Sequence, residues 1–264
     1  MIQPSAWAFP TVDQLKLIFD DAMADGVIYM AIFYVVFQPL AKLIFSRRSL
    51  YDNHKSSWKA LMVFYNIGMS IYSLVTFVLS VRALMSTNGV FTTDANDTFT
   101  SPLFERLAYF FFLSKWVEYL DTLFLIVAGK PVSVLQYYHH LGAAIDMWLL
   151  WRYGNSAAWI FVVFNSFIHT LMYAYYACTI RGIPVGALKW LMTFLQILQL
   201  VFGTGFSFWY PFNQPAFAYD FRRITGFVFS TWYTTTLLVL FTQFFVKSYL
   251  KKPKSSNKSS KKKQ

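Results

Sequence analysis

The sequence predicts an all-α protein that crosses a membrane several times. Of its 264 residues, 56% are hydrophobic, 21% aromatic and only 13% charged, and this balance is too apolar for a water-soluble domain of this length. Seven apolar stretches approach the roughly 20 residues that an α-helix needs to cross the hydrocarbon layer. The expected membrane-spanning helices lie near residues 27–45, 58–81, 103–127, 134–151, 157–179, 188–208 and 224–247.

The segments around these spans complete a three-part organisation. Residues 1–26 lack the basic start and apolar run of a signal peptide, so we expect them to form a lumenal N-terminal segment. Residues 27–247 form the seven-helix membrane domain, and the lysine- and serine-rich residues 248–264 are expected to be a disordered cytoplasmic tail. The fourth span is short and interrupted by polar residues, which leaves a six-span arrangement with a re-entrant segment as an alternative.

The distribution of basic residues predicts the orientation in the membrane. With the C-terminus in the cytoplasm, the cytoplasmic side carries 16 Lys and Arg residues and the lumenal side six, in agreement with the positive-inside rule. Near the end of the tail, Lys261 and Lys262 resemble a dilysine signal for retrieval to the endoplasmic reticulum. Attraction of the tail to anionic headgroups is the alternative. We therefore expect an endoplasmic reticulum membrane protein with a lumenal N-terminus.

Four consecutive spans carry polar or ionisable residues, which are costly inside a bilayer and therefore mark functional candidates. The third span contains KWVEYLDT, in which Lys115 and Glu118 can form an ion pair. Asp121 has no cation in its own helix, so it is free to orient a histidine from another span. The fourth span contains QYYHH, in which Gln136 stands about one turn before the two histidines.

The fifth and sixth spans continue this polar pattern. The fifth contains NSFIHTLMYAYY, in which Asn165 and His169 stand one turn apart, close enough to share a hydrogen-bond network. The sixth contains TFLQILQL, in which Gln196 and Gln199 point broadly one way. One such polar stripe commonly serves only to hold neighbouring helices together by hydrogen bonds, but four stripes on consecutive spans indicate a reaction site.

The interior histidines favour acid, base or nucleophile chemistry over metal binding. Three histidines could hold zinc, but His139 and His140 are adjacent and diverge by about 100° around a helix. They would therefore not easily bind one ion together. No metal is expected.

The four motifs together resemble the sequence boxes of the ELO family of very-long-chain fatty acid elongases. KWVEYLDT resembles the KxxExxDT box, QYYHH the HxxHH box, NSFIHTLMYAYY the NxxxHxxMYxYY box and TFLQILQL the TxxQxxQ box, in the family's order. Gln136 stands where most of the family has a first histidine. This QxxHH variant resembles microalgal, fungal and protist elongases that act on polyunsaturated acyl chains.

The resemblance implies a 3-oxoacyl-CoA synthase that condenses a long acyl-CoA with malonyl-CoA to give 3-ketoacyl-CoA, carbon dioxide and CoA, with no cofactor. It implies that spans two to seven surround an acyl tunnel with CoA at its cytoplasmic mouth. A C18 polyunsaturated substrate is expected, although the sequence does not distinguish a Δ6 from a Δ9 double bond. The ketoacyl-CoA reductase, dehydratase and enoyl reductase of the elongation cycle are expected partners. Nucleic acid is not an expected partner, and the sequence does not decide between a monomer and a homodimer.

We expect His139 to attack the acyl thioester, Asp121 to fix its tautomer and His169 to assist, with direct condensation as the alternative. Gln136 is expected to orient a ring by a hydrogen bond, or alternatively only to pack between helices. The expected catalytic residues are His139, His140, His169, Asp121, Asn165 and Gln136. The expected substrate-binding residues are Lys115, Glu118, Lys130, Tyr173, Tyr176, Gln196 and Gln199.

Two further sets describe the ends of the expected tunnel. The basic mouth that would receive CoA phosphates is assigned to Lys115, Lys130, Arg181 and Lys189. The floor that would limit chain length is assigned to Phe202, Phe206, Trp209 and Trp232. A seven-span transporter with a polar solute path is the alternative function, and a lipid acyltransferase of unrelated fold, working without decarboxylation, is a third.

Overall fold

The computed structural model describes residues 10–45, 49–86, 101–213 and 220–250. All regular elements in these ranges are helices, which confirms the predicted all-α class. The helices are α1 (Val12–Ala24), α2 (Val27–Ile44), α3 (Ser49–Asn53), α4 (Lys55–Met85), α5 (Pro102–Val117), α6 (Tyr119–Val127), α7 (Val134–Arg152), α8 (Ala158–Ile180), η3 (Gly186–Leu188), α9 (Lys189–Asn213), α10 (Phe221–Phe245) and the π-helical η5 (Val246–Leu250). Of the expected disordered tail, residues 248–250 instead belong to η5, and residues 251–264, with Lys261 and Lys262, lie outside the described residues.

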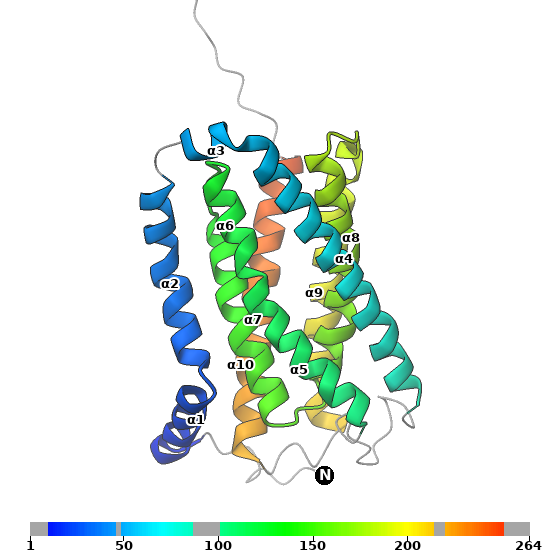
Figure 1. Ribbon diagram of the computed structural model, residues 1–264. Coiled ribbons are helices and arrows are strands. Elements are labelled where there is room, and N and C mark those ends of the chain that lie inside the picture. Colours follow the sequence, from blue (N-terminus) through cyan, green and yellow to red (C-terminus); the bar gives the residue numbers. More distant parts are fainter. Residues whose placement is uncertain (1–9, 46–48, 87–100, 214–219, 251–264) are drawn as a thin grey trace, which may run out of the picture.

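The long helices run side by side in one bundle, with α1 across one end and α3 at the other (Figure 1). We call these the α1 end and the α3 end. Helix α4 packs on α8, α10 packs on both α9 and α7, and α5 packs on α7. Helix α2 packs on α6 and α7 from the outside of the bundle.

Five helices are long and apolar enough to cross a membrane, which confirms a polytopic membrane protein. They cover Val27–Ile44, Lys55–Met85, Ala158–Ile180, Gly186–Trp209 and Phe221–Leu250. The expected third span is instead divided at Glu118 into α5 and α6, each of which is shorter than a bilayer crossing. The expected fourth span forms α7, whose histidines, Asp146 and Arg152 reduce its apolar character.

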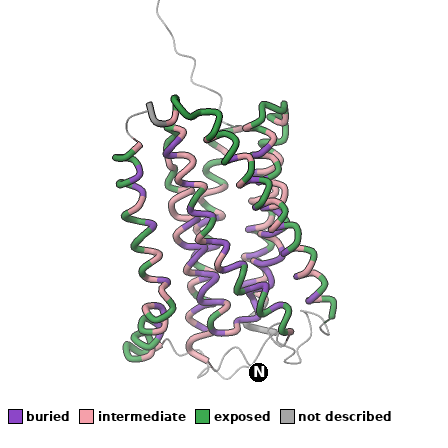
Figure 2. The backbone as a smooth tube through the Cα atoms, in the orientation of Figure 1, coloured by how far each residue is buried: buried purple, intermediate pink, exposed green. Residues whose placement is uncertain are grey.

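Apolar side chains face outward as well as inward, as expected of a bundle surrounded by lipid. Phe64 is 77% exposed and Trp232 is 58% exposed. Figure 2 shows that buried segments gather in the half of the bundle toward the α1 end.

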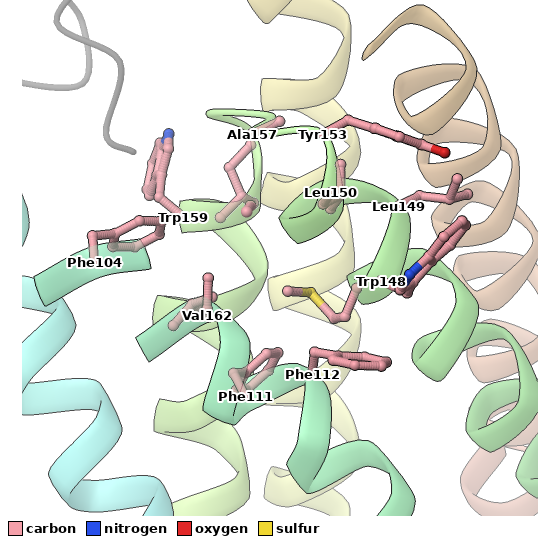
Figure 3. Packing of buried hydrophobic residues seen from close by; sticks show 14 of the residues in the cluster. Phe104, Phe111, Phe112, Trp148, Leu149, Leu150, Tyr153, Ala157, Trp159 and Val162 are labelled. Carbon is pink, nitrogen blue, oxygen red and sulfur yellow. The ribbon is translucent and has the colours of Figure 1, made fainter. Parts of the chain in front are cut away.

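A cluster of aromatic and aliphatic side chains fills this half. Phe104, Phe111 and Phe112 of α5 meet Trp148 and Leu150 of α7, and side chains of α8 complete the cluster (Figure 3). Burial of such side chains contributes roughly 1.5–3 kcal/mol each in water, whereas in lipid their close packing supplies the attraction between helices. The α1 half of the bundle is therefore solid, and space for a ligand lies toward the α3 end.

Helix α1 was not predicted, because the sequence analysis assigned no element to residues 1–26. A capping box between Thr11 and Gln14 begins this helix. Its acidic residues then attach it to the α1 end of the bundle. Asp25 Oδ2 accepts hydrogen bonds from Arg152 Nε at 2.8 Å and from Trp148 Nε1 at 3.0 Å.

Candidate active site

A cavity of about 470 Å³ lies within the bundle, lined by residues of α4 to α10. No described residue of α2 lines it, as expected for a tunnel surrounded by spans two to seven. Among the predicted site residues, all except Glu118 line this cavity. They are Gln136, His139, His140, Asn165, His169, Asp121, Lys115, Lys130, Tyr173, Tyr176, Gln196 and Gln199. The four sequence motifs therefore meet around one space.

A buried ion pair lies within the third expected span, and a hydrogen bond to Asn165 links it to the fifth. Lys115 Nζ donates to Glu118 Oε1 at 2.7 Å and to Asn165 Oδ1 at 2.8 Å. The two charged side chains are only 3% and 2% exposed, so each compensates the burial of the other. This confirms the Lys115–Glu118 pair that the sequence predicted. The helix break at Glu118 lets its carboxylate face both Lys115 and α8.

The same network fixes the tautomer of His169. The oxygen of the Asn165 amide accepts from Lys115, so its nitrogen Nδ2 faces His169 Nε2, at 3.1 Å. Since an amide nitrogen only donates, Nε2 must accept and the proton sits on Nδ1. That nitrogen lies 3.4 Å from Glu118 Oε1. The hydrogen bond predicted between Asn165 and His169 is confirmed.

His139 is oriented by a tyrosine that the sequence analysis missed. Its Nδ1 lies 3.1 Å from the hydroxyl of Tyr233, and that hydroxyl donates to the backbone carbonyl of His139 at 2.9 Å. Because the hydroxyl proton is already used, its oxygen accepts the proton of Nδ1. The other ring nitrogen, Nε2, then carries an unshared electron pair.

The predicted contact between Asp121 and a histidine is wrong. Asp121 Oδ2 instead accepts a hydrogen bond from the hydroxyl of Tyr173 at 2.8 Å. The residue that fixes the His139 tautomer is Tyr233, on α10, a span in which no sequence motif marked a site. Its position depends on Gly142, one turn after His139, because a Cβ atom there would overlap the Tyr233 ring.

Gln136 makes the orienting hydrogen bond that the sequence predicted, and its partner is His140. Ser133 caps the start of α7 by accepting from the Gln136 backbone N–H. The Gln136 amide then reaches His140 Nε2 at 2.6 Å, one turn further along. His140 is 4% exposed, and its Nδ1 has no hydrogen-bond partner among the described residues. Whether this bond serves catalysis stays a prediction.

Glu118, His139 and His169 offer atoms that all lie within 4.8 Å of one another. These two histidines come from two different spans, α7 and α8, and are not the adjacent pair His139 and His140. This set fits a metal ion poorly, because Glu118 Oε1 already accepts from the Lys115 ammonium at 2.7 Å. A divalent cation at that oxygen would lie beside a buried positive charge. The expectation of no metal stays a prediction.

The basic mouth is only partly as predicted. Lys130 and Lys189 line the cavity at the α3 end and are exposed. Lys115 is wrong as a mouth residue, because it is 2% exposed and forms the internal ion pair. Arg181 is exposed and is not among the described residues that line the cavity.

The predicted floor residues do not line the cavity. Phe202 is 51% exposed and faces outward, as Trp232 does, while Phe206 and Trp209 pack against the core cluster. Three residues connect the cavity wall to the core cluster. Phe111 and Met147 belong to both, and Phe161 lines the cavity and packs against the cluster.

Replacing Tyr233 with phenylalanine should slow catalysis without unfolding the protein. The Nδ1–H of His139 would lose its acceptor, and an orphaned buried donor costs about 1–3 kcal/mol. Because the ring would also lose its fixed tautomer, we expect kcat to fall by about 10- to 100-fold while KM changes little. Steady-state kinetics of the purified variant measure kcat and KM separately.

The matched control is Tyr138→Phe. Tyr138 packs on Tyr233 with ring centroids 5.6 Å apart, and its hydroxyl has no hydrogen-bond partner among the described residues. Its kcat should stay close to the wild-type value. Equal losses in both variants would contradict the role assigned to Tyr233.

The fold and the site define a polytopic helical membrane protein with an interior cavity lined by histidines. Residues 22–257 match the model of the ELO: GNS1/SUR4 family. The chain therefore belongs to this family of fatty acid elongases.

Individual relatives agree with this family. A Dictyostelium discoideum relative is 32% identical over 230 residues, covering 81% of this chain and 75% of the relative. Fatty acid elongase 2 of Trypanosoma brucei brucei is 29% identical over 216 residues, covering 76% of this chain and 79% of its own. Very long chain fatty acid elongase 4 of Trypanosoma cruzi is 30% identical over 202 residues, which cover 71% of this chain and 67% of the relative. Membership favours the elongase prediction over the transporter and the unrelated acyltransferase.

Proposed function

We propose that this protein condenses a C18 polyunsaturated acyl-CoA with malonyl-CoA, giving 3-ketoacyl-CoA, carbon dioxide and CoA. The observation that carries the proposal is the hydrogen bond between His139 Nδ1 and the Tyr233 hydroxyl, from which we infer an unshared electron pair on Nε2. The Tyr233 oxygen accepts the proton of His139 Nδ1, at 3.1 Å. The other nitrogen, Nε2, carries no proton and is therefore the nucleophile. The ring lies on the wall of the cavity beside His169.

In the first half-reaction, Nε2 of His139 attacks the carbonyl carbon of the acyl thioester. A C–N bond forms, the C–S bond breaks, and the CoA thiolate leaves with the electron pair and takes a proton from solvent at the mouth. The product is an acyl-imidazolium whose Nδ1–H remains on the Tyr233 oxygen. His169, held by Asn165 at 3.1 Å with its Nδ1 proton toward Glu118 Oε1, lies beside the reacting carbon and assists by shielding it from water.

In the second half-reaction, malonyl-CoA occupies the mouth that CoA has left. Loss of carbon dioxide leaves the electron pair of the broken C–C bond on the remaining two-carbon thioester as an enolate. This enolate attacks the acyl carbon, and the C–N bond breaks and returns the electron pair to His139. The negative charge of malonate cancels the positive charge of the acyl-imidazolium, so the second half-reaction balances without a further reactant.

The orientation in the membrane that we propose follows the distribution of basic residues along the sequence. Helices α5 with α6, and α7, are the third and fourth of seven spans, and the α3 end with Lys130 and Lys189 faces the cytoplasm. The protein lies in the endoplasmic reticulum membrane with its N-terminus in the lumen. The QxxHH variant at Gln136 supports a polyunsaturated substrate, and a reductase, a dehydratase and an enoyl reductase act on the product.

The test is a condensation assay with the purified protein, C18 polyunsaturated acyl-CoA and malonyl-CoA labelled in its free carboxyl group. We expect labelled carbon dioxide and unlabelled 3-ketoacyl-CoA in equal amounts. Omitting acyl-CoA is the control for uncoupled decarboxylation. Movement of a solute across vesicles with no new C–C bond would contradict the proposal and favour a transporter.

A further inference from the structure

A second cavity lies outside the catalytic one, between α2 and the start of α7. We call it the outer cavity. It has a volume of about 370 Å³ and is lined by one face of α2, from Val35 to Lys42, and by residues around the start of α7, from Val132 to Tyr137. Val35 is 43% exposed and Val134 is 75% exposed, so the outer cavity reaches the apolar surface that lipid covers. The chemistry proposed above does not use it.

The start of α7 gives the outer cavity a positive end. Ser133 caps this helix by accepting from the backbone N–H of Gln136, whereas the N–H groups of Val134 and Leu135 have no partner within the helix. The N-terminus of a helix of 19 residues carries a partial positive charge that attracts anions. Lys42, exposed near the end of α2, adds a full positive charge. The described residues that line the outer cavity include no acidic residue.

Gln38 points to a ligand independently of these charges. Its side chain forms part of the cavity wall and is only 5% exposed, and its Nε2 has no hydrogen-bond partner among the described residues. A half-turn about the last side-chain bond exchanges the amide nitrogen and oxygen, so the group can turn a donor toward an occupant. Pro39 has no N–H, and the carbonyl of Val35 therefore lacks its usual helical donor. The wall thus holds polar groups that a polar occupant would satisfy.

The order of these groups along α2 matches a phospholipid lying beside the bundle. Lys42 lies near the end of α2, and Val35 stands seven residues earlier, about 10.5 Å deeper along the helix axis. A lipid with its phosphate at Lys42 would lay its acyl chains over the exposed side chain of Val35, toward the middle of the bilayer. A free phosphate ion would satisfy only the charged groups and leave this apolar part of the wall uncovered.

We propose that the outer cavity binds the phosphate of a membrane phospholipid, held by Lys42, Gln38 and the start of α7. Ser133 lines both the outer and the catalytic cavity. The residue that it caps, Gln136, forms the 2.6 Å hydrogen bond to His140. The bound lipid therefore stabilises the start of the helix that carries two of the interior histidines. The inference goes beyond the proposed function and does not depend on it, because lipid binding requires no condensation.

The experiment measures lipid binding to the purified, delipidated protein by native mass spectrometry. The two probes are dioleoyl phosphatidic acid and dioleoylglycerol, which lacks only the phosphate. We expect saturable binding of one phosphatidic acid, and binding of dioleoylglycerol at least about tenfold weaker. Lys42→Ala should weaken the binding of phosphatidic acid by about fivefold. The matched control is Lys59→Ala, at an exposed position of α4 that is not among the described residues lining the outer cavity, and it should bind as the wild type does.

Gln38→Leu should have opposite effects with and without lipid. In the delipidated protein this variant should unfold at a higher temperature than the wild type, because it removes a buried amide that lacks a partner. On addition of phosphatidic acid it should gain less thermal stability than the wild type, because it binds the lipid more weakly. A residue that served only to pack α2 against α7 would not produce this reversal. If Gln38→Leu fails to fold, the comparison of Lys42→Ala with Lys59→Ala still decides.

Three results would overturn the inference. The first is equal binding of the two lipids, and the second is an equal loss of binding in Lys42→Ala and Lys59→Ala, which would indicate general attraction to a basic surface. The third is displacement of phosphatidic acid by millimolar inorganic phosphate with the same gain in thermal stability, which would identify a site for free phosphate. Each of these results would leave the proposed function intact, because none of them measures condensation.

Discussion

Replacing His139 with alanine should reduce condensation by at least about 10³-fold, because it removes the atom that accepts the acyl group. The substitution deletes a half-buried ring that makes one side-chain hydrogen bond, to Tyr233. The expected cost in stability is therefore only about 1 kcal/mol. Production of 3-ketoacyl-CoA at saturating substrates measures the loss of activity, and thermal unfolding in detergent measures the stability.

The control for this change is His54→Ala. His54 is exposed at the start of α4 and is not among the described cavity-lining residues, so its loss should leave the activity unchanged. A folded His139→Ala protein that condenses at more than a tenth of the wild-type rate would contradict the role of His139.

Replacing Lys115 with methionine should destabilise the protein by about 3–5 kcal/mol, because it leaves the buried carboxylate of Glu118 without its cation. The ammonium also donates to Asn165 at 2.8 Å. Its loss therefore frees the amide that holds His169 and should lower the activity too. Denaturant titration in mixed micelles, followed by tryptophan fluorescence, measures the change in stability.

The double variant Lys115→Met with Glu118→Gln separates charge from packing. Without the carboxylate there is no uncompensated buried charge, so the double variant should be more stable than Lys115→Met alone. Stability losses that simply add in the double variant would mean that the two side chains are not coupled.

Most helix positions could be predicted from the sequence, because apolar stretches of bilayer length leave little freedom. The expected 157–179 span corresponds to α8 (Ala158–Ile180), and the expected 134–151 span to α7 (Val134–Arg152). The division at Glu118 could not be predicted, because KWVEYLDT contains no proline or glycine that would mark a break in a helix. Helix α1 was missed because Asp21 and Asp25 find their partners on α7 and α10 only in the folded protein.

The histidines and their motif partners could be found from the sequence because polar residues are rare inside the bilayer. Tyr233 could not, since the chain has 17 tyrosines and this one belongs to none of the four motifs. Gly142 was the available signal: a glycine one turn after His139 allows another helix to approach closely. The floor was wrongly assigned because bulky residues such as Phe202 and Trp232 face outward, where the apolar environment of lipid accepts them as readily as a core does.

Attack by His139 on the acyl thioester is tested most directly by the mass of the intact protein after incubation with acyl-CoA alone. We expect an increase by the mass of one acyl group, release of an equal amount of CoA, and localisation of the acyl group to the peptide that contains His139. His139→Ala should show no increase, and adding malonyl-CoA should remove the acyl group from the wild type. A wild-type protein that condenses both substrates yet forms no adduct and releases no CoA from acyl-CoA alone would contradict a covalent intermediate on His139.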